Sequence, residues 1–87
     1  MLNNRLMSSF EEYYFKNIGK KIRYYRLKIG YTQEELSELL GMNDKYIGHV
    51  ERYERCISNK VLIRLLEVFK VQPKDFFQFD DDFNFKV

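Results

Sequence analysis

Hydrophobic side chains recur every three or four residues through the first third of the chain, which is the spacing of one face of an α-helix. They are Phe10, Tyr14, Ile18, Ile22, Tyr25 and Ile29. Ser8 stands three residues before Glu11, the order of a capping box that starts a helix. Gly30 follows the last hydrophobic position and suits a helix end. The pattern predicts one long helix over residues 9–29, loosened at Gly19, where there is no side chain.

Two shorter helices are predicted next. Thr32 is followed three residues later by Glu35, which makes a second capping box, and Gly41 ends the helix that Thr32 begins. Asn43 is the predicted cap of a third helix. The apolar positions of the two helices are Leu36, Leu39, Leu40, Ile47 and Val50.

A predicted loop at residues 53–57 separates the third helix from a fourth, which begins at Ser58 or Asn59, since either residue can cap it. The apolar face of the fourth helix consists of Val61, Leu62, Leu65, Leu66 and Phe69. Pro73 opens a short fifth helix over residues 73–77, because proline is favoured in the first turn of a helix.

Apolar and polar residues alternate at the end of the chain, with a period of two instead of the helical period. The apolar positions are Phe77, Phe79, Phe83, Phe85 and Val87, interrupted by an acidic run at residues 80–82. Three structures fit this pattern: a small hairpin, an edge strand in a dimer, or an unstructured end.

The distribution of charge says more than the net charge of +2. Residues 18–74 carry +5 and residues 75–87 carry −3. A basic body with an acidic end suits a protein that binds a polyanion. The same charges also suit an ordinary solvated helical surface, so charge alone does not decide between the two. With 87 residues, the chain is long enough for one domain.

Cysteine and histidine each occur once, as Cys56 and His49. One cysteine cannot form an internal disulfide, and together with one histidine it cannot make a four-ligand zinc site. No nucleophile–base pair and no glycine-rich phosphate loop stands out, so we expect no enzyme, no metal and no cofactor, and an inert thiol at Cys56. No apolar run approaches the length of a membrane span and no signal-peptide pattern begins the chain, which predicts a cytoplasmic protein.

The stretch at residues 33–52, QEELSELLGMNDKYIGHVER, meets the requirements of a helix-turn-helix. Two short helices that cross steeply need a small residue at the crossing, and Ser37 occupies that place. The tight turn needs a residue that tolerates a left-handed backbone, and Gly41 stands there. Five apolar residues are placed to fill the angle between the helices: Leu36, Leu40, Met42, Ile47 and Val50. The plainer alternative is an ordinary pair of amphipathic helices with a glycine between them.

The segments IGKKIRYYRLKIGYTQEELSELLGMNDKYIGHVER and VLIRLLEVFKVQPKDFF, within residues 18–77, resemble the Cro/repressor-type helix-turn-helix family, also called XRE. The resemblance implies an all-α, five-helix, lambda-repressor-like DNA-binding bundle. It also implies a transcription regulator that acts as a homodimer on a near-palindromic operator in double-stranded DNA. Residues 1–17 and 78–87 lie outside it. We expect the first of these segments to extend the first helix and the second to form a short aromatic and acidic tail.

The third helix is the candidate for the major groove, which is wide enough for one helix. Its N-terminal end and outer face carry four candidate base-contacting residues: Asn43, Asp44, Lys45 and His49. Lys45 can donate hydrogen bonds to O6 and N7 of guanine. Asp44 can accept one from N4 of cytosine, or only stabilise the helix N-terminus. Gly48 is expected to let this face approach DNA closely.

Six further residues are candidate phosphate contacts, each of which could equally be an ordinary exposed residue: Gln33, Tyr46, Arg52, Arg55, Asn59 and Lys60. The resemblance implies that Gln33 anchors the DNA backbone. It also implies a structural ion pair between Arg26 and Glu51, which would join the first helix to the end of the third.

The chain departs from the family in the loop after the third helix. The family often has glycine where Tyr53 stands and proline where Ile57 stands, so the backbone path of this loop is open. The alternative function is an antitoxin or protein-interaction module of the same fold. It rests on the tyrosines and phenylalanines of the first helix and the tail, which could form a surface for a protein partner. A dimer interface uses the same residue types, so composition does not discriminate.

Overall fold

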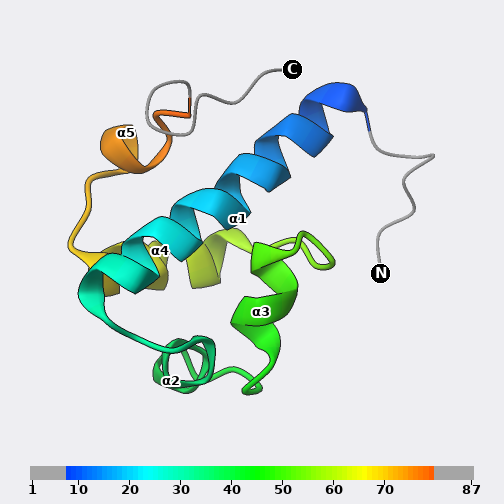
Figure 1. Cartoon of the computed structure of the whole chain (residues 1–87). Coiled ribbons are helices and arrows are strands. Elements are labelled where there is room, and N and C mark those ends of the chain that lie inside the picture. Colours follow the sequence, from blue (N-terminus) through cyan, green and yellow to red (C-terminus); the bar gives the residue numbers. More distant parts are fainter. Residues whose placement is uncertain (1–7, 80–87) are drawn as a thin grey trace.

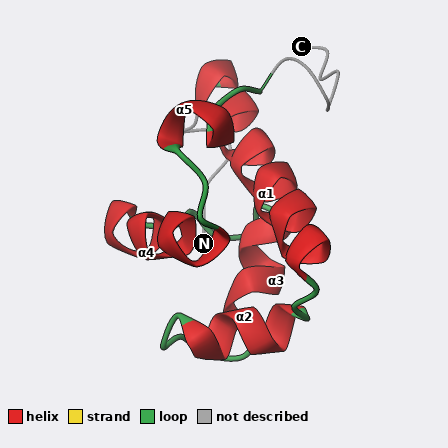
Figure 2. Ribbon diagram, turned by 90° about the vertical axis from the view of Figure 1, so that its left-hand side faces the viewer, coloured by secondary structure: helices red, strands yellow, loops and turns green. Residues whose placement is uncertain are grey.

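The computed structural model describes residues 8–79, and the regular structure among these residues is entirely helical (Figure 1, Figure 2). The helices are α1 (Ser9–Ile29), α2 (Gln33–Leu39), α3 (Tyr46–Glu51), α4 (Asn59–Phe69) and α5 (Pro73–Phe76). The predicted five-helix fold with a long first helix is confirmed. Most of the predicted tail, at residues 80–87, lies outside the described residues, as do residues 1–7.

The first helix begins and ends where its capping residues predict. The Ser8 hydroxyl accepts a hydrogen bond from the Glu11 N–H at 3.1 Å, and the Glu11 carboxylate accepts one from the Ser8 N–H at 2.8 Å. Gly30 has a left-handed backbone with a φ of 102°, and its N–H donates to the carbonyl of Arg26. Residues 9–17 therefore continue the helix that crosses the rest of the domain.

The prediction that Gly19 loosens α1 is wrong. Gly19 lies instead where the backbone of α1 packs directly against the end of α3. The helix is continuous through this residue, and Gly19 is buried. A methyl group added to it would lie 2.9 Å from the backbone oxygens of both Val50 and Glu51. The missing side chain lets the two helix backbones approach each other closely.

The third helix begins later than predicted. Asn43 does not cap it, because the Asn43 side-chain oxygen accepts a hydrogen bond from the Lys45 N–H at 2.9 Å and closes a turn ahead of the helix. Asparagine competes in this way with helix formation through its own side chain. The other predicted start signals hold: Thr32 and Glu35 form a capping box on α2, and Ser58 caps α4.

The core takes side chains from all five helices, which surround it (Figure 1). Four of the residues predicted to fill the angle between α2 and α3 are at most 2% exposed, namely Leu36, Leu40, Ile47 and Val50. Met42, the fifth, is partly buried against the same core. Figure 2 shows α2 at the base of the molecule and α5 at the opposite end.

Aromatic residues from the two ends of the described chain pack on one another. Tyr13 and Tyr14 in α1 contact Phe79, with ring centroids 6.2 and 6.1 Å apart, and Tyr14 stacks on Phe77 at 6.2 Å. Phe10 remains 72% exposed. Among the described residues, these four aromatic side chains of α1 and the segment after α5 therefore pack against one another within the chain.

We expect Gly19→Ala to lower the free energy of unfolding by about 1–3 kcal/mol, because the new methyl group would push the backbones of α1 and α3 apart. Urea denaturation monitored by circular dichroism measures the change. Arg23→Ala is the control, because it shortens an exposed side chain of the same helix and adds no atom near α3. An equal loss in the two variants would contradict the close crossing at Gly19.

Candidate nucleic-acid interface

Ser37 joins the two helices of the helix-turn-helix. The predicted small residue is fully buried, and its hydroxyl accepts a hydrogen bond from the Ile47 N–H at 3.0 Å while donating to the carbonyl of Gln33 at 2.8 Å. The N-cap residue of α3, Lys45, makes no side-chain capping bond. Ser37 therefore satisfies a free N–H at the start of α3 from a neighbouring helix.

The turn between the helices has the backbone that its glycine predicts. Gly41 has a φ of 73°, in the left-handed region that glycine adopts without steric cost. Arg64 on α4 donates a hydrogen bond to the Leu40 carbonyl at 3.0 Å, next to this turn. Sequence reasoning missed this contact, because nothing in the spacing of the two residues indicates it.

Arg26 and Glu51 form the expected ion pair, from α1 to the end of α3. The Arg26 Nε and Nη2 atoms donate to the two carboxylate oxygens of Glu51 at 2.6 and 3.1 Å. The two side chains are only 7% and 4% exposed. A third donor of Arg26, Nη1, reaches the Tyr31 carbonyl at 3.0 Å, so the guanidinium also fixes the loop before α2. The pair thus joins the last residue of α3 to α1.

Gln33 completes this buried cluster. Its amide nitrogen donates to the Glu51 carboxylate at 2.9 Å, which ties the start of α2 to the end of α3. Gly48 faces the same side chain, since an added methyl group would lie 3.0 Å from the Gln33 oxygen. Gly48 is buried, so our expectation that it opens the helix face to DNA is wrong. It makes room for Gln33 instead.

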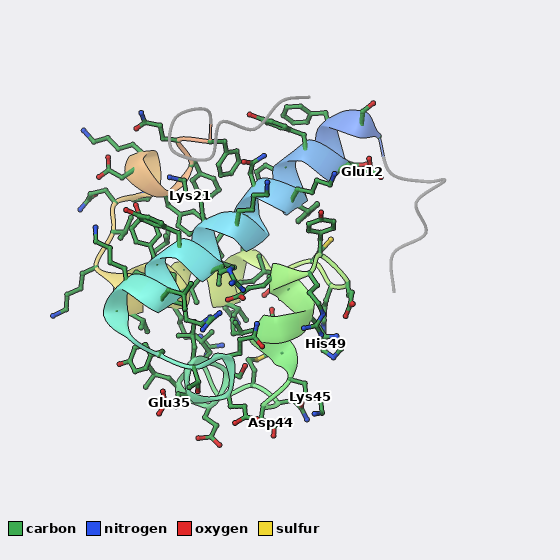
Figure 3. The ribbon with its side chains drawn as sticks, in the orientation of Figure 1. Glu12, Lys21, Glu35, Asp44, Lys45 and His49 are labelled. Carbon is green, nitrogen blue, oxygen red and sulfur yellow. The ribbon has the colours of Figure 1, made fainter. Side chains whose placement is uncertain are left out.

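The four candidate base-contacting residues all lie at the surface of the molecule. Asn43, Asp44 and Lys45 are exposed in the turn before α3, and the His49 side chain, on α3 itself, is 42% exposed. In Figure 3, Asp44, Lys45 and His49 lie along one edge of the domain, with their side chains directed away from the core. The structure thus brings the predicted residues together on the outer side of α3 and the turn that leads into it.

A small charged cluster lies at the end of α3. The His49 Nδ1 atom is 2.8 Å from a carboxylate oxygen of Glu54, and Arg52 donates to the same carboxylate at 3.2 and 3.3 Å. Hydrogen bonds from Arg52 and His49 hold the pKa of Glu54 below its usual value. Sequence reasoning missed Glu54, because an acidic residue is not expected among groups proposed to meet a polyanion.

The predicted phosphate contact by Tyr46 is wrong. Its side chain belongs to the core and is 3% exposed, so it cannot reach a ligand outside the domain. Burial raises the pKa of the phenol, and the positive charge of Arg55 opposes that effect. The Arg55 guanidinium lies 5.2 Å from the centre of the Tyr46 ring, a cation–π contact at the surface.

The other candidate phosphate contacts differ in how far they are exposed to solvent. Arg52, Arg55, Asn59 and Lys60 are exposed, whereas Gln33 is half-buried. Asn59 and Lys60 are the first two residues of α4.

The loop after α3, where the sequence departs from the family pattern, has a backbone conformation typical of glycine at Tyr53. Tyr53 has a φ of 43°, a left-handed conformation that is rare for a residue with a side chain. The Lys16 ammonium group lies 5.6 Å from the centre of its ring. Cys56 follows in the same loop, where burial raises the pKa of its thiol, so the thiol stays protonated and weakly nucleophilic.

Within residues 8–79, no three potential metal-binding side chains gather at one place. In the same part of the chain, no helix combines the length and apolar character that crossing a membrane requires.

Comparisons with known proteins agree with this geometry. The family profile described as Helix-turn-helix matches residues 22–76, more than half of the chain. An HTH-type transcriptional regulatory protein of Thermococcus kodakarensis is 39% identical over 72 residues, which are 79% of this chain but 23% of that protein. The chain thus spans about a quarter of the length of that relative.

Two shorter proteins match over most of their own length. An HTH-type transcriptional regulator of Archaeoglobus fulgidus is 34% identical over 62 residues, 71% of this chain and 89% of that protein. The crystal structure of the restriction-modification controller protein C.AhdI from Aeromonas hydrophila superposes with a TM-score of 0.66 at 30% identity. The match covers 72% of this chain and 96% of that one. The two relatives are described as HTH-type transcriptional regulators, and the solved structure is that of a controller protein.

We expect Glu51→Ala to lower the free energy of unfolding by about 3–5 kcal/mol, because the buried Arg26 charge would lose its partner. Gln33 would lose an acceptor in the same variant. Thermal and urea unfolding measure the loss, and Glu34→Ala, which removes an exposed carboxylate from α2, is the control. Similar stabilities for the two variants would show that the pair does not hold α3.

Proposed function

Because this chain belongs to the helix-turn-helix family of DNA-binding transcription regulators, we propose that it binds a near-palindromic operator as a homodimer. The observation that carries the proposal is the placement of Asn43, Asp44, Lys45 and His49. These four polar side chains lie on the outside of a helix and turn that a buried ion pair holds rigidly. A major groove admits one helix of this kind.

The proposed base contacts follow from the chemistry of the side chains. Lys45 donates hydrogen bonds to O6 and N7 of a guanine. Asn43 can both donate and accept, which suits N6 and N7 of adenine. Asp44 accepts from N4 of cytosine or only stabilises the start of α3, and both roles stay open. His49 lies one helical turn beyond Lys45 and would meet a neighbouring base pair.

The proposed phosphate contacts surround this face. The exposed side chains of Arg52, Arg55, Asn59 and Lys60 lie just after α3, in the following loop and at the start of α4, where they would meet the DNA backbone. Gln33 would act through the second N–H of its side-chain amide, because the first donates to Glu51. Such contacts supply affinity and register, whereas the base contacts supply sequence preference.

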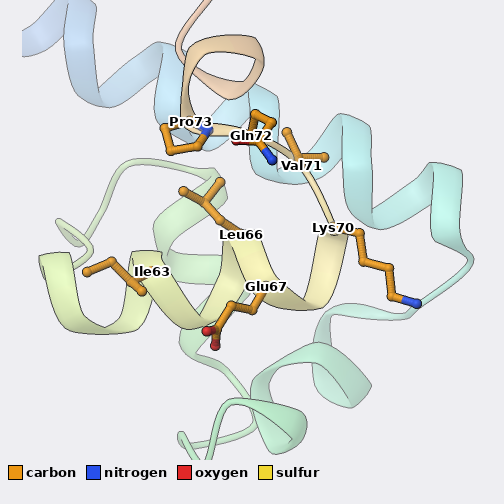
Figure 4. Close-up of a pocket in the computed structure, with 7 residues that line it drawn as sticks. All are labelled: Ile63, Leu66, Glu67, Lys70, Val71, Gln72 and Pro73. Carbon is orange, nitrogen blue, oxygen red and sulfur yellow. The ribbon is translucent and has the colours of Figure 1, made fainter.

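We place the homodimer interface on α4 and the segment that leads to α5. A groove of about 460 Å³ lies there, with Ile63, Leu66, Val71 and Pro73 among its lining residues (Figure 4). Ile63 is 60% exposed, a large apolar area for a surface helix. None of these residues belongs to the proposed DNA face.

The charges at the groove favour a second copy of the same chain as its occupant. Glu67 and Lys70 both line it (Figure 4). A two-fold axis brings the same patch of two copies together, so the acid of one copy can face the base of the other. Two recognition helices related by such an axis would enter successive major grooves about 34 Å apart.

Lys45→Ala should relax the preference at one base pair and weaken operator binding by about 1–3 kcal/mol, because the contact to guanine is lost. Selection from a randomised DNA pool identifies the base pair, and fluorescence titration of the selected operator measures the affinity. Lys74→Ala removes the same charge from an exposed position of α5, at the opposite end of the domain from α2 (Figure 2), and serves as the control.

Unchanged operator selection in the Lys45 variant would contradict the assignment of Lys45 as a base contact.

The affinity of the wild-type protein for its operator should fall steeply as the salt concentration rises, since several phosphates are neutralised and their counterions released. A flat salt response would count against DNA as the partner.

Ile63→Glu should convert the dimer into a monomer at micromolar concentration, because two buried charges would face each other across the two-fold axis. Sedimentation equilibrium measures the mass, and circular dichroism checks the fold. Leu27→Glu is the matched control, since Leu27 is another exposed apolar residue, 56% accessible on α1. A wild-type monomer, or an Ile63 variant that stays dimeric, would remove this interface.

A further inference from the structure

Glu54 is held against the end of α3 by both its backbone and its side chain. Its N–H donates to the His49 carbonyl at 2.8 Å, which satisfies one of the free carbonyls at the helix end. Its carboxylate lies 2.8 Å from His49 Nδ1 and is also bonded by Arg52. Four bonds thus place one acidic side chain beside the proposed base-contacting histidine.

This arrangement decides which nitrogen of His49 carries the proton. An ionised carboxylate can only accept hydrogen bonds, so the Nδ1 atom that faces it must be the donor. The lowered pKa of Glu54 keeps the carboxylate ionised. In the neutral form of the ring, the lone pair is then on Nε2, the nitrogen that Glu54 does not occupy.

We infer that Glu54 is a positioning residue that determines sequence preference: it fixes the His49 ring so that Nε2 accepts a hydrogen bond from an exocyclic amino group of a base. In the major groove, that group is N4 of cytosine or N6 of adenine. The inference rests on the proposed function, because it requires α3 to enter the major groove.

The position of His49 supports this role. The residue lies one turn after Lys45, and residues four apart share a helix face. The His49 side chain is 42% exposed, and it is directed to the same edge of the domain as Lys45 (Figure 3). Lys45 can only donate hydrogen bonds, whereas the neutral His49 would offer an acceptor, so the two residues would select different base edges.

The cluster of His49, Arg52 and Glu54 contributes little to the stability of the fold, so its residues can be substituted without unfolding the domain. Glu54 and Arg52 are 46% and 54% exposed at their side chains, and exposed ion pairs add little to stability. Glu54→Met keeps the length of the side chain and removes both the charge and the acceptor. Glu12→Met makes the same change at an exposed position of α1, at the opposite end of the domain from Lys45 (Figure 3), and is the matched control.

The first test uses the protein without DNA. His49 is the only histidine of the chain, so long-range 15N spectra at pH 8.5 report its two ring nitrogens without ambiguity. In the wild-type protein and in Glu12→Met, Nδ1 should be protonated. In Glu54→Met, the spectra should shift toward protonation at Nε2. The same tautomer in Glu54→Met and in the wild-type protein would overturn the inference.

The second test selects operators from a randomised DNA pool with Glu54→Met, His49→Ala, Glu12→Met and the wild-type protein. Glu54→Met and His49→Ala should lose preference at the same base pair, by about 5- to 100-fold, as expected for one specific contact. Glu12→Met should select as the wild-type protein does. An operator that lacks the amino group at that base pair should bind the wild-type protein more weakly and should bind His49→Ala unchanged.

Two results of the second test would overturn the inference about Glu54 and leave the proposed function standing. They are unchanged operator selection by Glu54→Met, or a loss of preference in Glu54→Met at a base pair where His49→Ala keeps its preference. Failure of the wild-type protein to select any sequence would overturn the proposed function as well. The spectra of the free protein separate the two cases, because they report the ring without DNA.

Discussion

The buried contact between Arg26 and Glu51 is the interaction on which the rest of the structure depends. Glu51 stands at the last residue of α3 and accepts hydrogen bonds from Arg26 on α1 and Gln33 on α2. Two ionised groups taken out of water need every donor and acceptor satisfied, and here a single carboxylate serves two helices besides its own. A six-residue helix has too few internal bonds to be stable alone, so these contacts give α3 its fixed direction.

The contacts of Glu51 with Arg26 and Gln33 are possible because the helices around them approach one another closely. Gly19 lets α1 lie against the end of α3, and Gly48 leaves room for the Gln33 side chain between α2 and α3. Ser37 adds a bond from α2 to the unprotected start of α3. Both ends of the proposed recognition helix are therefore anchored from other helices, while its outer face carries only exposed or half-exposed polar groups. A surface held in this way binds with little loss of conformational entropy.

The electrostatic character of the proposed DNA face is mixed, and this is consistent with sequence-selective binding. A uniformly basic face would bind any duplex through its phosphates. Asp44 and Glu54 place negative charge beside Lys45, His49 and Arg52, so part of the non-specific attraction is offset. Hydrogen bonds to base edges then account for a larger share of the binding free energy, which is the condition for discrimination between sequences.

Local signals in the sequence determined the five helices, the capping boxes at Ser8 and Thr32, and the turn at Gly41, because helix periodicity and capping depend on residues three or four positions apart. The ion pair and the family came from resemblance to a known pattern. Only the tertiary structure placed Tyr46 in the core, moved the start of α3 past Asn43, buried Gly48 and brought Glu54 to His49. Each of these outcomes depends on which helix packs against which, and the identity of a neighbour in space is not encoded in any short stretch of chain.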